Sequence, residues 1–244
     1  MANNPPNAIF LENNLLQEGG YFMATRIILI RHGQTDWNLE NRYQGHADTG
    51  LNRKGVRQAK RLSIRMRRED VDRVYSSDRR RAMDFAKIIF PMHKVKVEPD
   101  LREISFGIFE GLTYDEIKNK YPGVYSRWAD KPFDIKIPKG EAPALFRKRV
   151  VRSFKKIARS GEGKTVAIVT HGGSINVIVN KVMGRQDSLD FIPKSASISI
   201  IEFKRGKGSV VLLNDTAHLS RPLSYSGGIP PGIGKRREWA GKDG

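Results

Sequence analysis

The chain reads Arg26-Ile27-Ile28-Leu29-Ile30-Arg31-His32-Gly33-Gln34-Thr35 near its start. Four apolar residues run without a polar break, which is typical of a strand buried on both faces. In an open α/β sheet, ligands bind beyond the carboxyl ends of such strands. Arg31 and His32 therefore stand where a ligand is expected, and Gly33 lets the backbone approach that ligand closely. A strand followed by an arbitrary polar turn stays an alternative until the rest of the chain is considered.

Predicted strands and helices alternate along the chain. We expect strands at 26–31, 72–76, 95–97 and 165–170, with a closing hairpin at 196–203 and 209–213. We expect helices at 53–68, 79–89 and 142–158, and a further helix that follows His171-Gly172-Gly173 and runs through Met183. We expect loops at 36–50 and 100–112, and short helices broken by prolines at 113–140. This alternation predicts an α/β fold, a three-layer α/β/α sandwich with a mainly parallel central sheet.

The two ends of the chain have a different composition. Residues 1–22 are polar and rich in Asn, so we predict a disordered extension, and we hypothesise that translation starts at Met23. Residues 220–244 turn to Ser, Gly and Pro and then to a basic cluster, which predicts a disordered basic tail. A single domain over residues 23–219 is left between them.

Length and composition fit one domain without disulfides. The chain has 244 residues, enough for an α/β domain with a substantial core. No apolar run approaches the length of a membrane span, and we see no secretory leader in residues 1–22. Cysteine is absent, which excludes a disulfide framework and thiolate chemistry. We therefore predict a cytoplasmic protein.

The formal net charge of +18 is high. It indicates either an anionic partner or a solvated basic surface. The charge is spread widely, although residues 53–81 hold twelve Lys or Arg against four Asp or Glu. We favour the solvated surface for most of it, because the sequence has no nucleic-acid-binding motif. No specific nucleic acid and no membrane is expected as a partner.

Two predicted strands end in the same dipeptide. Residues 27–33 and 166–172 each form an apolar run that closes on His-Gly, so His32 and His171 converge if these strands are neighbours. One ligand that a site of this kind would suit is a phosphomonoester, which carries about two negative charges near neutral pH. Its transfer depends mainly on positioning and on electrostatic stabilisation of the phosphoryl oxygens. Arginine suits that task because its planar fork grips two oxygens, and a neutral imidazole can act as a nucleophile.

Five short blocks then follow one another in the chain. They are Arg31-His32-Gly33-Gln34-Thr35 with Asn38; Ser76-Ser77-Asp78-Arg79-Arg80-Arg81-Ala82; Leu101-Arg102-Glu103 with Phe106-Gly107 and Glu110-Gly111; Gly140-Glu141; and Thr170-His171-Gly172-Gly173. Each block alone is a weak signal. Together and in this order, over most of residues 26–219, they resemble the histidine phosphatase superfamily, which includes the cofactor-dependent phosphoglycerate mutases.

The resemblance implies a role for each matching residue. His32 would be the nucleophile that forms a phosphohistidine, although spacing alone does not distinguish it from His171. The phosphoryl group would be held by Arg31, Arg81 and His171, with Asn38 and the Gly172 backbone N–H as further donors. Pocket positions of the family match Thr35, Gln44 and Gly45, although each of these can also simply shape a turn.

Glu103 would be the general acid and then the base that activates water. Glu110 competes for this role, and the Leu-x-Glu context favours Glu103. No His, Asp and Glu cluster has the spacing of metal ligands, so we expect neither a metal nor another cofactor.

Other residues near the blocks receive lesser roles. Arg79 and Arg80 are expected to be solvated, and His46 and His93 to lie at the surface. His218 is expected to be structural. Trp37 is an apolar group placed to touch a substrate.

Two kinds of enzyme, a phosphatase and a mutase, would use the same phosphohistidine chemistry. The segment between Glu103 and Gly140-Glu141 is shorter than in the mutases, and a short lid shields a phosphohistidine from water less well. We therefore favour a phosphatase acting on a small phosphorylated substrate. The aromatics Tyr114, Tyr125, Trp128 and Phe133 indicate either a partly apolar leaving group or ordinary core filling.

Two further alternatives concern the partner. A phosphoprotein phosphatase would use the basic surface to recognise an acidic protein. A non-catalytic phosphate-binding module would lack His32 or Glu103, and both are present. The oligomeric state is open, with a homodimer as one option.

Overall fold

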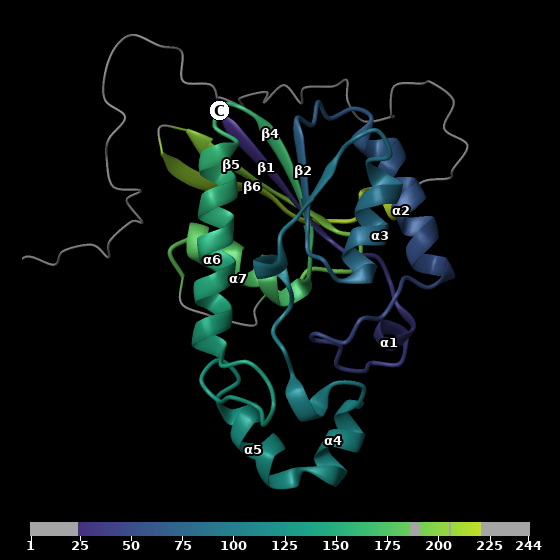
Figure 1. Ribbon diagram of the computed structural model, residues 1–244, viewed down its shortest axis with the longest axis vertical. Coiled ribbons are helices and arrows are strands. Elements are labelled where there is room, and N and C mark those ends of the chain that lie inside the picture. Colours follow the sequence, from purple (N-terminus) through teal and green to yellow (C-terminus); the bar gives the residue numbers. More distant parts are fainter. Residues whose placement is uncertain (1–23, 186–190, 205, 221–244) are drawn as a thin grey trace, which may run out of the picture.

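The computed structural model describes residues 24–185, 191–204 and 206–220. The predicted extension at 1–22, and the predicted tail apart from residue 220, lie outside these residues. The remainder forms one central sheet with helices on both faces and a smaller lobe beyond one end of the sheet (Figure 1).

The sheet has six strands in the order β3-β2-β4-β1-β5-β6. The strands are β1 (Thr25–Arg31), β2 (Arg73–Ser76), β3 (Val95–Val97), β4 (Thr165–Thr170), β5 (Ile198–Lys204) and β6 (Lys207–Asp215). The four strands from β3 to β1 pair in parallel, whereas β5 and β6 are antiparallel. The predicted, mainly parallel sheet is therefore confirmed.

Four helices complete the outer layers of the sandwich. Helices α2 (Arg53–Met66) and α3 (Arg80–Ile89) cover one face, and α6 (Pro143–Ser160) and α7 (Gly172–Val182) cover the other (Figure 1). The short α8 (Ala217–Ser220) packs near α2. This arrangement confirms the predicted three layers.

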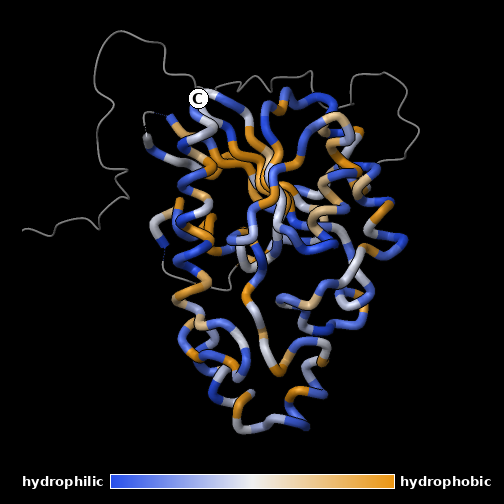
Figure 2. Tube along the Cα trace, in the orientation of Figure 1, coloured by the Kyte–Doolittle hydropathy of each residue, from blue (hydrophilic) through white to orange (hydrophobic). Residues whose placement is uncertain are grey.

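Strand β1 supplies both halves of the core because its apolar residues alternate between the faces of the sheet. Ile28 and Ile30 pack with α2 and α3, and Ile27 and Leu29 pack with α6 and α7. All four side chains are fully buried, and Figure 2 shows the apolar strands gathered at the centre of the fold. The unbroken apolar run of the sequence is thus explained by burial from two sides.

The loop predicted at 36–50 contains a short helix, which corrects that prediction. Thr35 begins α1 (Asp36–Leu39) through a capping box, in which its hydroxyl accepts from the Asn38 N–H and the Asn38 side chain accepts from the Thr35 N–H. Such reciprocal bonds satisfy two amide donors at a helix start. Four residues are too few to produce a periodic apolar pattern, so this helix could not be predicted from apolar periodicity.

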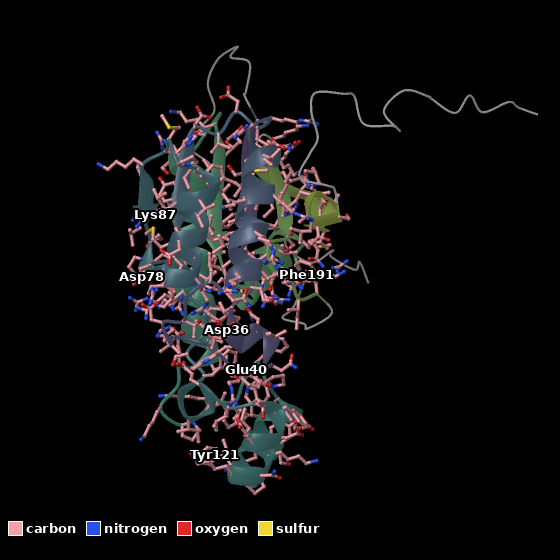
Figure 3. All side chains as sticks on the ribbon, turned by 90° about the vertical axis from the view of Figure 1, so that its right-hand side faces the viewer. Asp36, Glu40, Asp78, Lys87, Tyr121 and Phe191 are labelled. Atoms are coloured by element: carbon pink, nitrogen blue, oxygen red, sulfur yellow. The ribbon has the colours of Figure 1, made fainter. Side chains whose placement is uncertain are left out.

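A lobe formed by residues 104–141, here called the lid, projects beyond the sheet. It holds α4 (Tyr114–Lys120), α5 (Pro122–Asp130) and the 3₁₀ turn Gly107–Phe109. Figure 3 shows Tyr121 near its far end, with Asp36 and Glu40 between that residue and the sheet. A second 3₁₀ turn, Pro99–Leu101, precedes the lid.

The lid has a small core of its own. Phe109, Ile117 and Ile137 are buried there, and Tyr125 and Trp128 pack against them. The interpretation of these two aromatics as core filling therefore agrees with the structure. Tyr114 lies edge-on to Tyr125 and is 45% exposed.

No helix in the described ranges is both long enough and apolar enough to cross a bilayer.

Candidate active site

Two histidines meet at the carboxyl ends of neighbouring strands. Strands β1 and β4 pair in parallel with Arg31 opposite Thr170, and the His32 N–H donates to the Thr170 carbonyl over 2.9 Å. The next residue of each strand is therefore a histidine at the same edge. The ring centroids of His32 and His171 lie 5.2 Å apart with the planes inclined by 62°. The convergence expected from the two His-Gly strand ends is confirmed.

His32 is held as a neutral ring. Its Nδ1 lies 2.7 Å from the Gly33 carbonyl oxygen, which can only accept, so the ring proton sits on Nδ1. Burial, and then the charges of Arg81 and Arg31, lower the pKa of His32 well below its ordinary value of 6.5. The Nε2 atom consequently carries a lone pair at neutral pH.

His171 is fixed from β2, the neighbour of β4 on its other side. Its Nε2 lies 2.9 Å from the Ser77 hydroxyl, and that hydroxyl accepts a long bond from the Arg79 N–H. The Ser77 proton is then available to His171 Nε2, which leaves Nδ1 as the protonated nitrogen. Burial lowers the pKa of His171 well below 6.5, so this ring is also neutral.

Two arginines reach the same region from different elements. Arg81, in the first turn of α3, donates to the carbonyls of Gly45 and Ala47, each over 2.7 Å. Arg31, at the end of β1, donates to the Pro193 carbonyl. Burial lowers the pKa of both, that of Arg81 to about 10, and the carboxylate of Glu103 opposes the shift in each case. Both guanidinium groups stay charged at neutral pH.

Several buried nitrogens at this edge have no protein acceptor. In the described part of the chain, Arg31 Nε, Arg81 Nε and His171 Nδ1 are buried without a hydrogen-bond partner. A buried polar group without a partner costs free energy, and such atoms occur where a ligand supplies the missing bond. All three are donors, so the ligand that suits them is an anion.

Glu103 lies opposite the amino end of α7. Its Oε2 accepts from the Gly173 N–H over 2.8 Å, and its Oε1 accepts from the Ile104 N–H over 3.0 Å. A Cβ at Gly173 would stand 2.3 Å from Glu103 Oε1, so any larger residue there would force the carboxylate to move. Because Gly172 and Gly173 open the helix, their N–H groups point out of its amino end, where negative charge is favoured.

Glu110 accepts hydrogen bonds from a different set of donors than Glu103. Its Oε1 accepts from the N–H groups of His46 and Phe106 and from the Ser105 hydroxyl, and its Oε2 accepts from the Ala47 N–H. These bonds tie the loop at 44–47 to the base of the lid. Because its four bonds join this loop to the lid, Glu110 acts as a structural brace. Glu103 also accepts from two backbone N–H groups, but its charge acts on both Arg31 and Arg81, so it is the carboxylate beside the arginines.

The remaining predicted pocket residues form one small network. The Thr35 hydroxyl contacts Asn38 Oδ1 and Gln44 Oε1, which leaves the amide nitrogens of Asn38 and Gln44 as the donors that could turn to a ligand. Gly45 has φ of +51°, and a Cβ there would lie 2.2 Å from Glu110 Oε1. A glycine is therefore required to aim the Gly45 carbonyl at Arg81.

Two lesser expectations, those for His46 and Arg79, need correction. His46 is half-buried rather than at the surface, and its Nε2 donates to the Glu103 carbonyl over 3.0 Å. Arg79 is not merely solvated, because its Nη1 donates to the His46 carbonyl and its Nη2 pairs with Asp78. For His46 and Arg79, the loop at 44–48 folds back onto the strand ends, and no local sequence pattern predicts such a contact. Trp37 lies beside Gly111 of the lid, and its expected contact with a substrate stays a prediction.

Other lesser expectations agree with the structure. Arg80 and His93 are exposed, and His218 is buried in α8. Burial lowers the pKa of His218 to about 4. Among the described residues, no group of three or more His, Cys, Asp or Glu is arranged to hold a metal ion.

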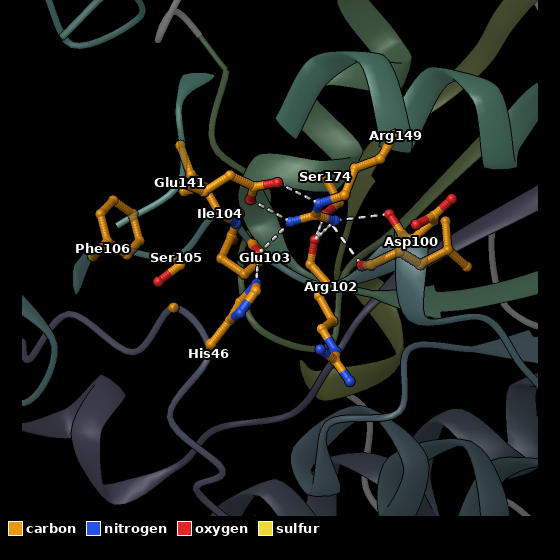
Figure 4. A network of polar contacts seen from close by, with 12 residues as sticks. His46, Asp100, Arg102, Glu103, Ile104, Ser105, Phe106, Glu141, Arg149 and Ser174 are labelled. Atoms are coloured by element: carbon orange, nitrogen blue, oxygen red, sulfur yellow. Dashed lines mark hydrogen bonds and ion pairs between the residues drawn. The ribbon is translucent and has the colours of Figure 1, made fainter. Parts of the chain in front are cut away.

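Two residues that support the site, Ser77 and Arg149, were not predicted from the sequence. Ser77 was quoted within a block but was given no role, and it contacts His171. Arg149 was not singled out, and it bonds to the backbone around Glu103 (Figure 4). Nothing in the sequence separates Arg149 from Arg152 one turn later, since both are basic positions of one amphipathic helix.

Comparisons with known proteins agree with this site. The family model of the histidine phosphatase superfamily, branch 1, matches residues 27–216. A metal-independent phosphoserine phosphatase of Arabidopsis thaliana is 33% identical over 203 residues, which are 81% of this chain and 84% of that protein.

Solved structures give the same result. The α-ribazole phosphatase of Shigella flexneri superposes with a TM-score of 0.74 at 26% identity, covering 78% of this chain and 96% of that one. A phosphoserine phosphatase of Entamoeba histolytica, solved with 3-phosphoglyceric acid, superposes with a TM-score of 0.72 at 27% identity, covering 80% and 99%.

Proposed function

The chain belongs to the histidine phosphatase superfamily, and from this premise we propose that it is a metal-independent phosphomonoester hydrolase acting on a small phosphorylated metabolite. Phosphoserine is the first substrate to test, because the relative that is 33% identical is a phosphoserine phosphatase. The α-ribazole phosphatase with the similar structure makes α-ribazole phosphate the second.

The proposal rests on one observation. A neutral histidine ring lies beside buried N–H groups that have no hydrogen-bond partner in the described residues. His32 offers Nε2 with a lone pair because its Nδ1 proton is engaged with the Gly33 carbonyl. Buried donors of Arg31, Arg81 and His171 have no protein acceptor in the described residues. A phosphoryl group supplies the acceptors that these donors lack, and its charge is balanced by the two guanidinium groups.

The first half-reaction exchanges one bond at phosphorus for another and transfers one proton. The lone pair of His32 Nε2 attacks phosphorus, and the bond from phosphorus to the leaving oxygen breaks. The carboxyl proton of Glu103 passes to that oxygen, so the product leaves as an alcohol. Arg31, Arg81 and His171 stabilise the negative charge on the equatorial oxygens during transfer.

The second half-reaction restores the enzyme. A water oxygen attacks the phosphohistidine while the Glu103 carboxylate accepts a proton from that water. The bond between phosphorus and Nε2 breaks, its electron pair returns to the ring, and inorganic phosphate leaves. Glu103 is again protonated and the cycle closes without a metal or cofactor.

The lid favours hydrolysis over mutase chemistry. A mutase must keep water from the phosphohistidine until the bisphosphate intermediate has formed, whereas a hydrolase must admit water. The lid here is a short lobe whose small core lies beyond the sheet. Assays with 3-phosphoglycerate and 2,3-bisphosphoglycerate are the direct test for mutase activity.

A substrate panel with one active-site variant tests the proposal. The panel contains phosphoserine, α-ribazole phosphate, 3-phosphoglycerate, sugar phosphates, a phosphohistidine-containing protein and p-nitrophenyl phosphate. We expect turnover that EDTA does not reduce, and an acid-labile phosphoenzyme trapped by rapid quenching. His32→Ala should abolish both and fold normally, and His93→Ala, at an exposed position, is the matched control. Full activity of His32→Ala would show that the nucleophile is assigned wrongly.

A further inference from the structure

The backbone that carries Glu103 has no partner strand. Residues 100–103 run between the sheet and the lid, and side chains take up four successive carbonyl groups there. The Leu101 carbonyl accepts from the hydroxyls of Thr170 and Ser174, and the Arg102 carbonyl also accepts from Ser174. Because buried carbonyls need donors, this segment keeps its shape only while those side chains are in place.

Arg149, on α6, supplies most of the other donors (Figure 4). Its Nη1 donates to the carbonyls of Asp100 and Arg102, and its Nη2 donates to the carbonyl of Glu103, each over 2.8 Å. The Glu103 carbonyl also accepts from His46. One guanidinium group thus holds three of the four carbonyls, including that of the proposed acid.

The same guanidinium binds Glu141, the last residue of the lid segment. Its Nε and Nη2 donate to the two carboxylate oxygens of Glu141, both over 2.7 Å. The Glu141 N–H in turn donates to the Ser105 carbonyl at the near end over 3.0 Å. Arginine has five N–H donors in a fixed planar fork, and all five are used here.

The burial of this group sets it apart from its neighbours on the helix. The side chains of Arg149 and Glu141 are 15% and 17% exposed. Arg152, one turn later, also pairs with the segment through the Asp100 carboxylate, but its side chain is 68% exposed. An exposed ion pair contributes little, whereas a bidentate, largely buried pair that also holds backbone carbonyls fixes geometry.

From these contacts we propose that Arg149, held by Glu141, is the positioning residue for the general acid Glu103. It joins the two ends of the lid to the backbone of that acid, so that lid placement and proton delivery depend on one guanidinium group. The inference rests on the proposed phosphatase function and adds a specific role for a residue that touches no substrate.

The test uses the dependence of the rate on the leaving group. A phosphate ester of an alcohol, such as phosphoserine, needs a proton on its leaving oxygen, whereas p-nitrophenolate leaves readily without one. The value of kcat/KM reports steps up to the first irreversible one, which is transfer to His32. Loss of acid positioning therefore lowers kcat/KM for phosphoserine, or for whichever alkyl phosphate the panel identifies, much more than for p-nitrophenyl phosphate.

We expect Arg149→Ala to reduce kcat/KM for the alkyl phosphate by on the order of 10²-fold. The loss for p-nitrophenyl phosphate should stay below about tenfold, since the phosphoryl-binding groups are intact. Glu103→Gln sets the scale, because it removes the acid itself and should show the same selectivity more strongly. Arg152→Ala is the matched control and should change neither substrate.

Two milder variants keep the test decisive if Arg149→Ala does not fold. Arg149→Lys retains the charge but cannot reach five acceptors, and Glu141→Gln retains the shape but not the charge pair. Both should shift the ratio of the two kcat/KM values in the same direction by a smaller factor. Equal losses for the two substrates would reveal a purely structural role and overturn the inference. A wild-type protein that cleaves neither substrate would instead overturn the proposed function.

Discussion

The end of the sheet and the lid are built on opposite principles. At the sheet end, His32 and His171 continue hydrogen-bonded strands, and the cores on both faces bury them. The lid is anchored by side chains that bond to irregular backbone, with Glu110 and Arg149 as its main braces. The groups proposed to bind the phosphoryl oxygens are therefore placed mainly by regular structure, and the group proposed to protonate the leaving oxygen is placed by individual side chains.

This difference in construction separates the residues proposed to transfer the phosphoryl group from those proposed to select the substrate. Hydrogen-bonded strands that are buried on both faces tolerate little displacement, because moving one residue disturbs the packing of the whole core. A lobe with a small core of three buried apolar side chains can alter its shape while the sheet stays fixed. Relatives that share the sheet end can accordingly act on different phosphate esters, as the phosphoserine and α-ribazole phosphatases illustrate.

The largest expected effect comes from a charge at the sheet end. Arg81→Ala removes a buried guanidinium beside His32 and should lower kcat/KM by on the order of 10³-fold, since such preorganised donors are often worth that much. Arg81→Lys should recover part of the loss, because a lysine supplies charge without the fork. Steady-state kinetics on p-nitrophenyl phosphate measures both.

The neighbouring Arg80 provides the control for this variant. It is exposed on the same turn of α3, so Arg80→Ala should leave kcat/KM within about twofold, as expected of a solvated charge. A comparable loss in both variants would mean that general positive potential, rather than the buried fork, supports transfer.

The second prediction compares the two cores directly. Ile168 in β4 and Ile117 in α4 are both essentially fully buried. Ile168→Ala should lower the free energy of unfolding by about 2–5 kcal/mol, because the cavity lies in the cooperative core. Ile117→Ala should cost less than about 1 kcal/mol globally, since the lid core can open locally, and it should raise KM instead.

Urea denaturation monitored by circular dichroism gives the global values, and hydrogen exchange locates the opening. A loss for Ile117→Ala as large as that for Ile168→Ala would mean that lid and sheet unfold as one unit. The two regions would then differ in construction but not in stability.

The same contrast explains how much could be predicted from the sequence. The sheet, its flanking helices and the meeting of His32 with His171 follow from apolar runs, caps and strand-end motifs, all of which are local patterns. The brace made by Arg149 and the half-buried state of His46 depend on backbone carbonyls brought close by the fold. No side-chain pattern encodes which carbonyl a given arginine will reach, so these contacts could not be inferred.

The lid shows the same limit in its helices. Proline positions predicted short helices at 113–140, and α4 and α5 confirm them. Whether Tyr125 and Trp128 faced a substrate or a core was undecidable, because both alternatives need an apolar surface. Only the packing around Phe109 resolves this point.

A third prediction concerns the boundary between the two regions. Gly173 stands where a Cβ would press against the Glu103 carboxylate, so Gly173→Ala should displace the acid and lower kcat/KM for an alkyl phosphate by about 10- to 100-fold. Gly123, in α5, has open space around it. Gly123→Ala should keep full activity and raise stability by up to about 1 kcal/mol through helix propensity.

Kinetics and thermal unfolding of the two variants make the comparison. If Gly173→Ala retained full activity toward the alkyl phosphate, the Glu103 side chain could relocate freely. The close approach at the amino end of α7 would then have no part in proton transfer.

The last prediction concerns a residue away from both regions, His218 in α8. Burial lowers its pKa in the folded chain to about 4, below the ordinary 6.5, although Asp215 nearby opposes the shift. As the pH falls from about 6.5 to about 4, the unfolded chain gains a proton at this site that the folded chain does not. Stability must therefore fall with decreasing pH in that window and level off below it.

His218→Gln removes this titration and should flatten the dependence of Tm on pH between about 6.5 and 4, relative to wild type. The buried rings of His32 and His171 titrate in the same sense and retain their part of the slope, so the difference between the two curves isolates His218. Parallel curves for wild type and His218→Gln would mean that His218 makes no contribution to acid sensitivity in this window, and that the buried histidines of the sheet end carry more of it.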